Sequence, residues 1–222
     1  MIYEYPNKDV SIRQGDIFYP LPQSIMRDLV NIKVITEDEQ IVKKTWVKIE
    51  NSKPIKAIVN VIPVWGIVVS QDCDAERAPY ITFFLIDTLL NVIKLSEPKP
   101  HKWHNFIIRY TKEKLDWHYL PVDKEIGFNN RMAVDFEEAF VVNRTYLIKN
   151  IAHLRKGRLN EVSLQHFRER ISHYFRRYAY NEWYPLNKDE FITYREKNAQ
   201  KGVIIEPYEW QKGKNDSLKK TS

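Results

Sequence analysis

The sequence predicts a mainly β domain, arranged as a barrel or sandwich, with an amphipathic helix near its C-terminal end. Two observations predict this class. The first two-thirds of the chain holds many short, β-branched runs that turn signals separate at hairpin distances. Residues 161–183 instead repeat apolar side chains at helical spacing. The chain has 222 residues, 43% of them hydrophobic, and can therefore bury a proper core.

The predicted strands begin with Gly15–Tyr19, which we expect Pro20 and Pro22 to end because proline cannot donate to a sheet ladder. A polar turn at residues 37–40 predicts a hairpin. The apolar runs on either side of Pro63 are typical of strands buried on both faces. The remaining predicted strands are residues 30–36, 41–49, 56–62, 64–70, 81–87, 106–110, 117–122, 132–136 and 139–142.

The rest of the chain is predicted to be helical. Residues 143–154 fit a short helix, and residues 161–183 fit a longer one that stops before Pro185. We therefore expect a β-rich barrel domain over residues 1–150, a helical segment packed on it over 151–197, and a polar, disordered extension over 198–222. The predicted core face of the longer helix consists of Leu164, Phe167, Ile171, Tyr174, Phe175 and Tyr178.

Composition narrows the classes of function. The net charge of +6 and the sequence pI of about 9.2 favour polyanionic partners such as nucleic acid. The chain contains neither GxGxxG nor GxxxxGK[ST], which argues against a Rossmann or P-loop nucleotide site. Its single cysteine cannot form an internal disulfide, no apolar run is long enough to span a bilayer, and the N-terminus lacks an apolar signal core. We therefore expect a cytoplasmic protein without a membrane partner.

The segment WGIVVSQDCDAERAPY, residues 65–80, contains that cysteine and allows three interpretations. Cys73 could be a nucleophile, although its acidic neighbours disfavour a thiolate. Asp72 and Asp74 could converge in a turn on a hard cation, with Asp16 or Glu76 as a third ligand. Alternatively the segment is a structural turn, in which the aspartates accept hydrogen bonds from backbone amides and Cys73 packs as a small apolar residue.

A cationic stripe on the longer helix is the candidate binding surface. Side chains at positions i, i+4, i+7 and i+11 lie on one face of a helix, beside the core face. Such side chains can contact phosphates, and an ordinary exposed amphipathic face would have the same pattern. The stripe consists of His166, Arg170, His173 and Arg177, and Arg168 and Arg176 widen it.

Tryptophan precedes histidine twice, at Trp103-His104 and at Trp117-His118. The strand predictions place both pairs at the outer ends of one hairpin. Together they could form an aromatic patch for stacking a ligand or a base. The alternative is two core tryptophans with histidines at the rim.

Four segments, taken in order, resemble a family of bacterial proteins, and this resemblance covers most of the chain. Its motifs imply no particular chemistry. They are RQGDIF at residues 13–18, GIVVSQDCD at 66–74, AVDFEEAFVV at 133–142 and LQHFRERISHYFRR at 164–177.

The chain also resembles the PemK/MazF-type toxins, which have an SH3-like barrel and cleave RNA without a metal. Residues 15–17 (GDI) and 67–70 (IVVS) match the first two strands of those toxins in type, although the spacing between them is longer here. The arginine expected before the second strand is replaced by residues 63–65 (PVW), and Thr82 stands where a later hydroxyl residue is expected. This resemblance therefore implies an SH3-like barrel with insertions more than it implies nuclease activity.

These observations favour a non-enzymatic cytoplasmic module that binds nucleic acid or a protein partner, and the likeness to toxins suggests a stress or phage-defence system. One alternative is a ribonuclease or other hydrolase, without a cofactor or with a divalent metal. Another is a scaffold that docks other proteins through its helix. The candidate catalytic residues are Asp16, Asp72, Asp74 and Thr82, with His118 as a base, and the candidate metal ligands are Asp16, Asp72 and Asp74.

Overall fold

The computed structural model describes residues 2–25, 30–46, 55–113, 116–176 and 188–204. The chain divides into two compact units, Met1–Tyr174 and Phe175–Ser222. All the strands among the described residues belong to the first unit. In the second unit, residues Lys188–Ala199 form helix α7, in which Phe191 is buried. The predicted end of the longer helix, at residues 177–183, and the predicted C-terminal tail from residue 205 onward lie outside the described residues.

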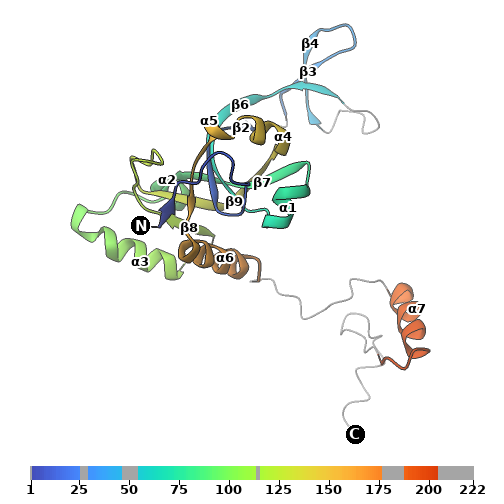
Figure 1. Cartoon of the computed structure of the whole chain (residues 1–222). Coiled ribbons are helices and arrows are strands. Elements are labelled where there is room, and N and C mark those ends of the chain that lie inside the picture. Colours follow the sequence, from blue (N-terminus) through green and yellow to red (C-terminus); the bar gives the residue numbers. More distant parts are fainter. Residues whose placement is uncertain (1, 26–29, 47–54, 114–115, 177–187, 205–222) are drawn as a thin grey trace. The chain divides into compact units, whose positions relative to one another are not determined.

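The first unit is built on an antiparallel sheet of seven strands (Figure 1). A mainly β fold is thereby confirmed, but the prediction of a closed barrel is wrong, because β1 and β8 remain unpaired edges. The order of the strands is β1 (Tyr3–Glu4), β10 (Arg155–Leu159), β2 (Asp16–Ile25), β6 (Asn60–Val68), β7 (Tyr80–Thr88), β9 (Met132–Asn143) and β8 (Trp117–Leu120).

Side chains, rather than a backbone ladder, connect the two edges of this sheet. The Tyr3 hydroxyl donates a hydrogen bond to the carbonyl of Pro121, just after β8, at 3.0 Å. The Tyr5 hydroxyl donates to Oδ1 of Asp123 at 2.8 Å. The sheet therefore curls so that its first strand approaches the loop that follows β8.

A second sheet of three strands is inserted in the chain between β2 and β6. It has the order β4 (Ile41–Lys44), β3 (Ile32–Ile35) and β5 (Lys56–Ile58). The predicted hairpin around residues 37–40 is confirmed, since β3 pairs with β4 in the register Ile35 to Ile41. Beyond Leu21 and Val64, β2 and β6 pair only with each other.

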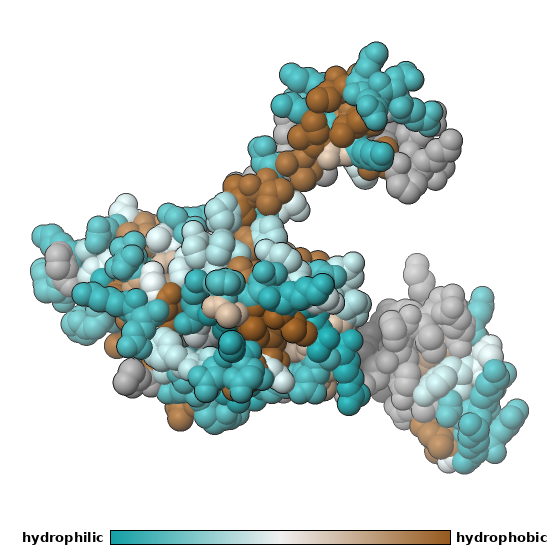
Figure 2. Space-filling view, turned by 45° about the horizontal axis from the view of Figure 1, so that its top comes forward, coloured by the Kyte–Doolittle hydropathy of each residue, from teal (hydrophilic) through white to brown (hydrophobic). Residues whose placement is uncertain are grey.

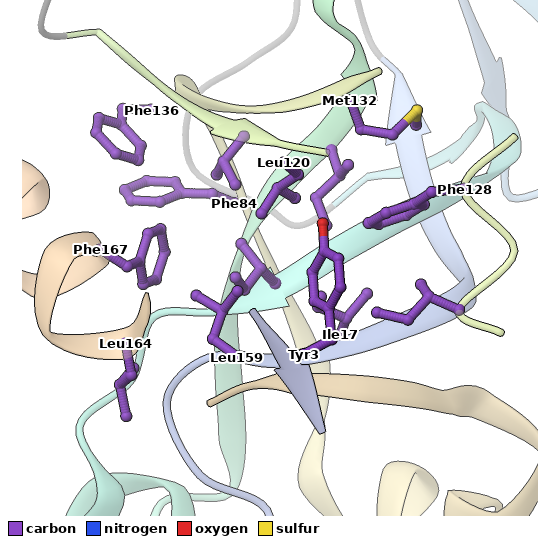
Figure 3. Close-up of a cluster of buried hydrophobic side chains, with 14 residues drawn as sticks. Tyr3, Ile17, Phe84, Leu120, Phe128, Met132, Phe136, Leu159, Leu164 and Phe167 are labelled. Carbon is purple, nitrogen blue, oxygen red and sulfur yellow. The ribbon is translucent and has the colours of Figure 1, made fainter. Parts of the chain in front are cut away.

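Helices cover both faces of the main sheet. On one face, α6 (Glu161–Arg176) inserts Leu164 and Phe167 into a core cluster that includes Tyr3, Ile17 and Phe136 (Figure 3). The other core clusters receive α1 (Asp72–Arg77), α2 (Leu89–Ile93), α3 (Trp103–Glu113), α4 (Arg144–Lys149) and α5 (Ile151–Leu154). No helix in the described ranges is both long enough and apolar enough to cross a membrane.

Two helix predictions are confirmed in their essentials. Residues 143–154 contain the short helices α4 and α5. On α6, Leu164 and Phe167 are buried and Ile171 and Tyr174 pack against the same cluster, as the helical period predicts. Phe175 is the exception, because its side chain is 62% exposed.

Several strand predictions are wrong. Residues 106–110 belong to helix α3, because Trp103, Phe106 and Ile107 recur at helical spacing and pack together on a core cluster. Consequently the two Trp-His pairs do not end one hairpin. β2 continues through both of its prolines, because its distal half has a neighbour on one side only and the missing N–H groups cost no ladder bond on the open side. Residues 132–142 form one strand, β9, with a register shift, and β1 and β10 were not predicted.

Candidate functional site

Three of the sequence motifs meet at one tight turn, which we call the Arg13–Asp16 turn. It closes with a hydrogen bond from the Asp16 amide to the Arg13 carbonyl at 3.2 Å. The Gly15 amide donates to the carbonyl of Val68 in β6 at 3.0 Å. Gly15 has φ of +87°, a left-handed conformation that glycine adopts without steric cost. The turn is therefore anchored to the strand that carries the GIVVS motif.

Asp16 lies at the centre of a buried ion-pair cluster with Arg155 and Arg158. Its side chain is fully buried, and Oδ2 accepts from Arg158 Nη2 at 3.0 Å and from Arg155 Nη1 at 3.2 Å. Oδ1 accepts from Arg158 Nε. Burial raises the pKa of the Asp16 carboxyl, and the hydrogen bonds and charges of the two arginines act in the opposite direction.

This arrangement favours a structural role for Asp16 over the predicted catalytic or metal-binding one. Both of its oxygens face guanidinium groups that come from β10, and the same two arginines donate to carbonyls of Asn7, Val10 and Ser11. The cluster therefore ties β10 and the segment before β2 to the turn. Its function is to hold the fold together, because no oxygen of Asp16 remains exposed for a substrate or cation.

Asp72 joins the same turn to α1 and α6. Its Oδ1 accepts from the Gln14 amide at 2.8 Å, and its Oδ2 accepts from Arg168 Nη2 at 3.2 Å. Arg168 Nε also donates to Oε1 of Gln14 at 2.7 Å, and Gln14 Nε2 donates to the Val69 carbonyl at 2.9 Å. Asp72 does accept from a backbone amide, but that amide belongs to Gln14, 58 residues away, and not to the turn of Asp72 itself as predicted.

Cys73 and Asp74 lie in the first turn of helix α1 rather than in a loop. Gln71 is the N-cap of this helix, and Ala75 is its buried residue. The prediction that Cys73 packs as a small apolar side chain is wrong, since Cys73 is exposed. Its Sγ lies 4.0 Å from Oδ1 of Asp74. Within the part of the chain that the structure describes, no group of three or more His, Cys, Asp or Glu side chains could hold a metal ion.

Thr82 lies in β7, where its carbonyl accepts from the Val69 amide at 3.0 Å beside this turn, and His118 lies in β8. The Thr82 amide donates to Oγ of Ser70 at 2.9 Å, and the residue is half-buried in β7. His118 lies in β8, with its ring 5.3 Å from that of Phe167 in α6. In the described ranges, no hydrogen bond or ion pair joins either residue to Asp16, Asp72 or Asp74. Direct hydrogen bonds and ion pairs among the described residues therefore do not join the five candidate catalytic residues into one network.

His118 is neutral in the folded protein. Burial lowers the pKa of its imidazole to about 3, and the nearby charges of Arg170 and His166 act in the same direction. Its Nδ1 is buried and has no hydrogen-bond partner. The residue behaves as an aromatic filler between β8 and α6, which is not the environment of a general base working near neutral pH.

This environment predicts a pH dependence of stability. Unfolded histidine binds a proton below about pH 6.5, whereas His118 in the folded state does so only near pH 3, so the unfolded state holds more protons between these values. The free energy of unfolding should therefore fall by up to about 1.4 kcal/mol per pH unit as the pH drops through this window. Urea unfolding of His118→Leu between pH 4 and 7 should show a shallower pH slope, and equal slopes would contradict the assignment.

The cationic stripe of α6 is only partly exposed. Arg170 donates from Nε to the Trp117 carbonyl at 2.8 Å and from Nη1 to the Thr111 carbonyl at 2.9 Å. His173 Nε2 lies 3.9 Å from Oε1 of Glu169, and His166 is exposed. Arg168 is engaged with Gln14 and Asp72. Arg177 and the side chain of Arg176 lie outside the described residues.

A second cationic surface, on α3, was missed because residues 106–110, in the middle of this helix, were predicted to be a strand. Residues 98–112 contain four lysines or arginines, two histidines and no acidic residue. The apolar side chains Trp103, Phe106 and Ile107 pack on the core, so the basic ones face outward. The helical spacing of these apolar residues was the available signal. The exposed basic side chains of α3 and the turn before it are Lys99, His101, Lys102, His104, Arg109 and Lys112.

The two cationic helices lie next to each other (Figure 1), and the bond from Arg170 to the Thr111 carbonyl joins α6 directly to α3. We name this region the α3–α6 surface. It comprises Lys99, His101, Lys102, His104, Arg109 and Lys112 with His166 and His173. No protein-family model matches the chain, and no curated protein matches it. The function is therefore inferred from the site itself.

Proposed function

We propose that this chain is a non-enzymatic module that binds nucleic acid through the α3–α6 surface. The observation that carries the proposal is that residues 98–112 contain six basic residues and no acidic one, and that their exposed basic side chains come from α3 and from the turn just before it. Lysine and arginine that neutralise phosphates release condensed counterions, which supplies most of the affinity of non-specific binding. The histidines of α6 would add donors to phosphate or sugar oxygens along the neighbouring helix.

The engagement of the candidate catalytic carboxylates supports a binding function over a hydrolytic one. Asp16 is paired with two arginines and Asp72 with Arg168, so these groups hold the Arg13–Asp16 turn to β10, α1 and α6. In keeping with the resemblance to PemK/MazF-type toxins, we propose that the curled sheet is an opened relative of the SH3-like barrel. A cytoplasmic stress or phage-defence role would fit this proposal.

Binding of labelled RNA and DNA, measured by fluorescence anisotropy over a series of salt concentrations, tests the proposal. The variant Lys102→Glu with Lys112→Glu should bind more weakly than the wild type. Its plot of log affinity against log salt concentration should be shallower by about 0.7 to 0.9 for each phosphate that the variant no longer neutralises. Arg170 is left unchanged, because it holds α6 to two backbone carbonyls and its replacement would disturb the fold.

The variant Lys8→Glu with Lys149→Glu is the matched control. Both lysines are exposed, and the substitutions change the net charge by the same amount. Lys8 lines a small cavity of about 280 Å³ together with Ala75 and Arg144, and Lys149 lies in α4, so neither belongs to the α3–α6 surface. If both variants weakened binding equally, net charge alone would explain the effect, and the α3–α6 surface would not be the binding site. Absence of binding by the wild type at low salt would remove the proposal.

A further inference from the structure

We infer a second nucleic-acid contact on the three-stranded sheet, made by one of its faces to the phosphate backbone. We call it the lysine face, and it consists of Lys33, Lys43 and Lys56 with Ile35, Ile41 and Ile58. The inference rests on the proposed function, because it assigns another surface to the same partner. It concerns an element that takes no part in the α3–α6 surface.

The register of the three strands places these side chains on one face. Lys33 pairs with Lys43 on one side and with Ile58 on the other, and Ile35 pairs with Ile41 and Lys56. Residues directly opposite each other in a sheet share a face, as do residues two apart along a strand. Burial agrees with this alternation, because Ile32 and Val34 on the opposite face are buried whereas all three lysines are exposed.

The lysine face concentrates like charge where a sheet ordinarily avoids it. Two lysines directly opposite each other repel, which destabilises the strand pair. Among the described residues, none of Lys33, Lys43 and Lys56 forms an ion pair. Among the described residues, the acidic side chains nearest in sequence to Lys33 and Lys43 are Glu37, Asp38 and Glu39, which lie in the turn between β3 and β4 rather than on the paired strands. An anionic partner lying across the face would relieve the repulsion.

The side chains between the lysines indicate what kind of anion fits. Figure 2 shows hydrophobic and hydrophilic residues side by side over the view of the molecule. The register places Ile35, Ile41 and Ile58 as the hydrophobic residues of the lysine face. Stacking of bases needs aromatic rings or guanidinium planes, and none lies among the paired residues of this face. Lysine ammonium groups act as point charges toward phosphates. The face therefore fits the backbone of a nucleic acid, without selection among bases.

Two variants of the full chain separate this role from a structural one. Lys43→Glu turns the repelling pair into an attracting pair, so hydrogen exchange of the β3 and β4 amides should slow while binding of labelled RNA weakens. Lys33→Glu with Lys43→Glu restores a like-charge pair, so amide protection should return to the wild-type level while binding weakens further. A folding defect would instead speed the exchange of these amides while binding weakens.

The salt dependence of binding gives the decisive comparison. For Lys33→Glu with Lys43→Glu, the slope of log affinity against log salt concentration should fall by about 0.7 to 0.9 for each phosphate no longer neutralised, and this decrease should add to that of Lys102→Glu with Lys112→Glu. If the Lys33/Lys43 variant bound RNA as tightly as the wild type while the Lys102/Lys112 variant bound more weakly, this inference would be overturned. The proposed function would still stand. If polyglutamate displaced labelled RNA from the face as effectively as unlabelled RNA does, the nucleic-acid assignment would also be overturned, in favour of an acidic protein.

Discussion

Replacement of Asp16 with asparagine is expected to lower the free energy of unfolding by about 3–5 kcal/mol, because it leaves two buried guanidinium groups without their counter-charge. The side chains of Arg155 and Arg158 are only 3% and 4% exposed, so solvent cannot take the place of the carboxylate. The asparagine side chain has nearly the same volume as aspartate, and the loss would therefore report charge and hydrogen bonding rather than packing. Urea unfolding at neutral pH measures it.

Asp74→Asn serves as the control for this prediction. Asp74 is exposed on α1, and surface substitutions of this kind usually change stability by less than about 0.5 kcal/mol. A loss below about 1 kcal/mol for Asp16→Asn would mean that the arginines are satisfied by the carbonyls of residues 7–11 alone. The central role of Asp16 in the Arg13–Asp16 turn would then be wrong.

Replacement of Gly15 with alanine is expected to cost about 2–4 kcal/mol. A left-handed backbone costs an L-residue about 1–2 kcal/mol, and overpacking of a core typically costs about 1–3 kcal/mol. Both apply here, because Gly15 has φ of +87° and a Cβ atom would lie 2.9 Å from Cδ1 of Leu164 on α6. Thermal and urea unfolding of the variant measure the sum.

A double-mutant cycle separates the two contributions. Leu164→Ala removes the atom that the new methyl group would meet, so the pair Gly15→Ala and Leu164→Ala should cost less than the sum of the single substitutions. In the Leu164→Ala background, the cost of Gly15→Ala should equal the cost of the left-handed backbone alone. Strict additivity would show that the helix and the turn are not in tight contact, contrary to the described packing.

Elements whose order comes from neighbouring residues were predictable. The acidic turn at residues 37–40 joins two β-branched runs, and the structure has a hairpin there. The spacing of Leu164, Phe167, Ile171 and Tyr174 predicted the core face of α6, and these four side chains pack as expected. In both cases the preference of nearby residues for a hairpin or an amphipathic helix is strong enough to identify the element without knowledge of distant contacts.

Elements whose conformation depends on distant partners were not predictable. β10 contains two arginines, a lysine and a glycine, a poor strand by composition, and it forms because Arg155 and Arg158 find Asp16 in the neighbouring strand. Residues 106–110 fit a strand by β-branched content, and packing of the whole helix on Trp117 and its neighbours decided otherwise. Tertiary burial overrides intrinsic preference at such segments.

The sequence by itself therefore determined the mainly β class, the hairpin of the small sheet, the core face of α6 and the excess of positive charge, since each follows from composition or from contacts within a few residues. The tertiary structure alone decided what the conspicuous side chains do. Asp16 meets its arginines 139 and 142 residues away, and Gln14 meets Arg168 after 154 residues. From the sequence, Asp16 is a candidate catalytic carboxylate, but in the folded chain it is paired with two arginines. The sequence does not reveal this pairing, because it depends on which distant strand the fold brings beside the buried charge.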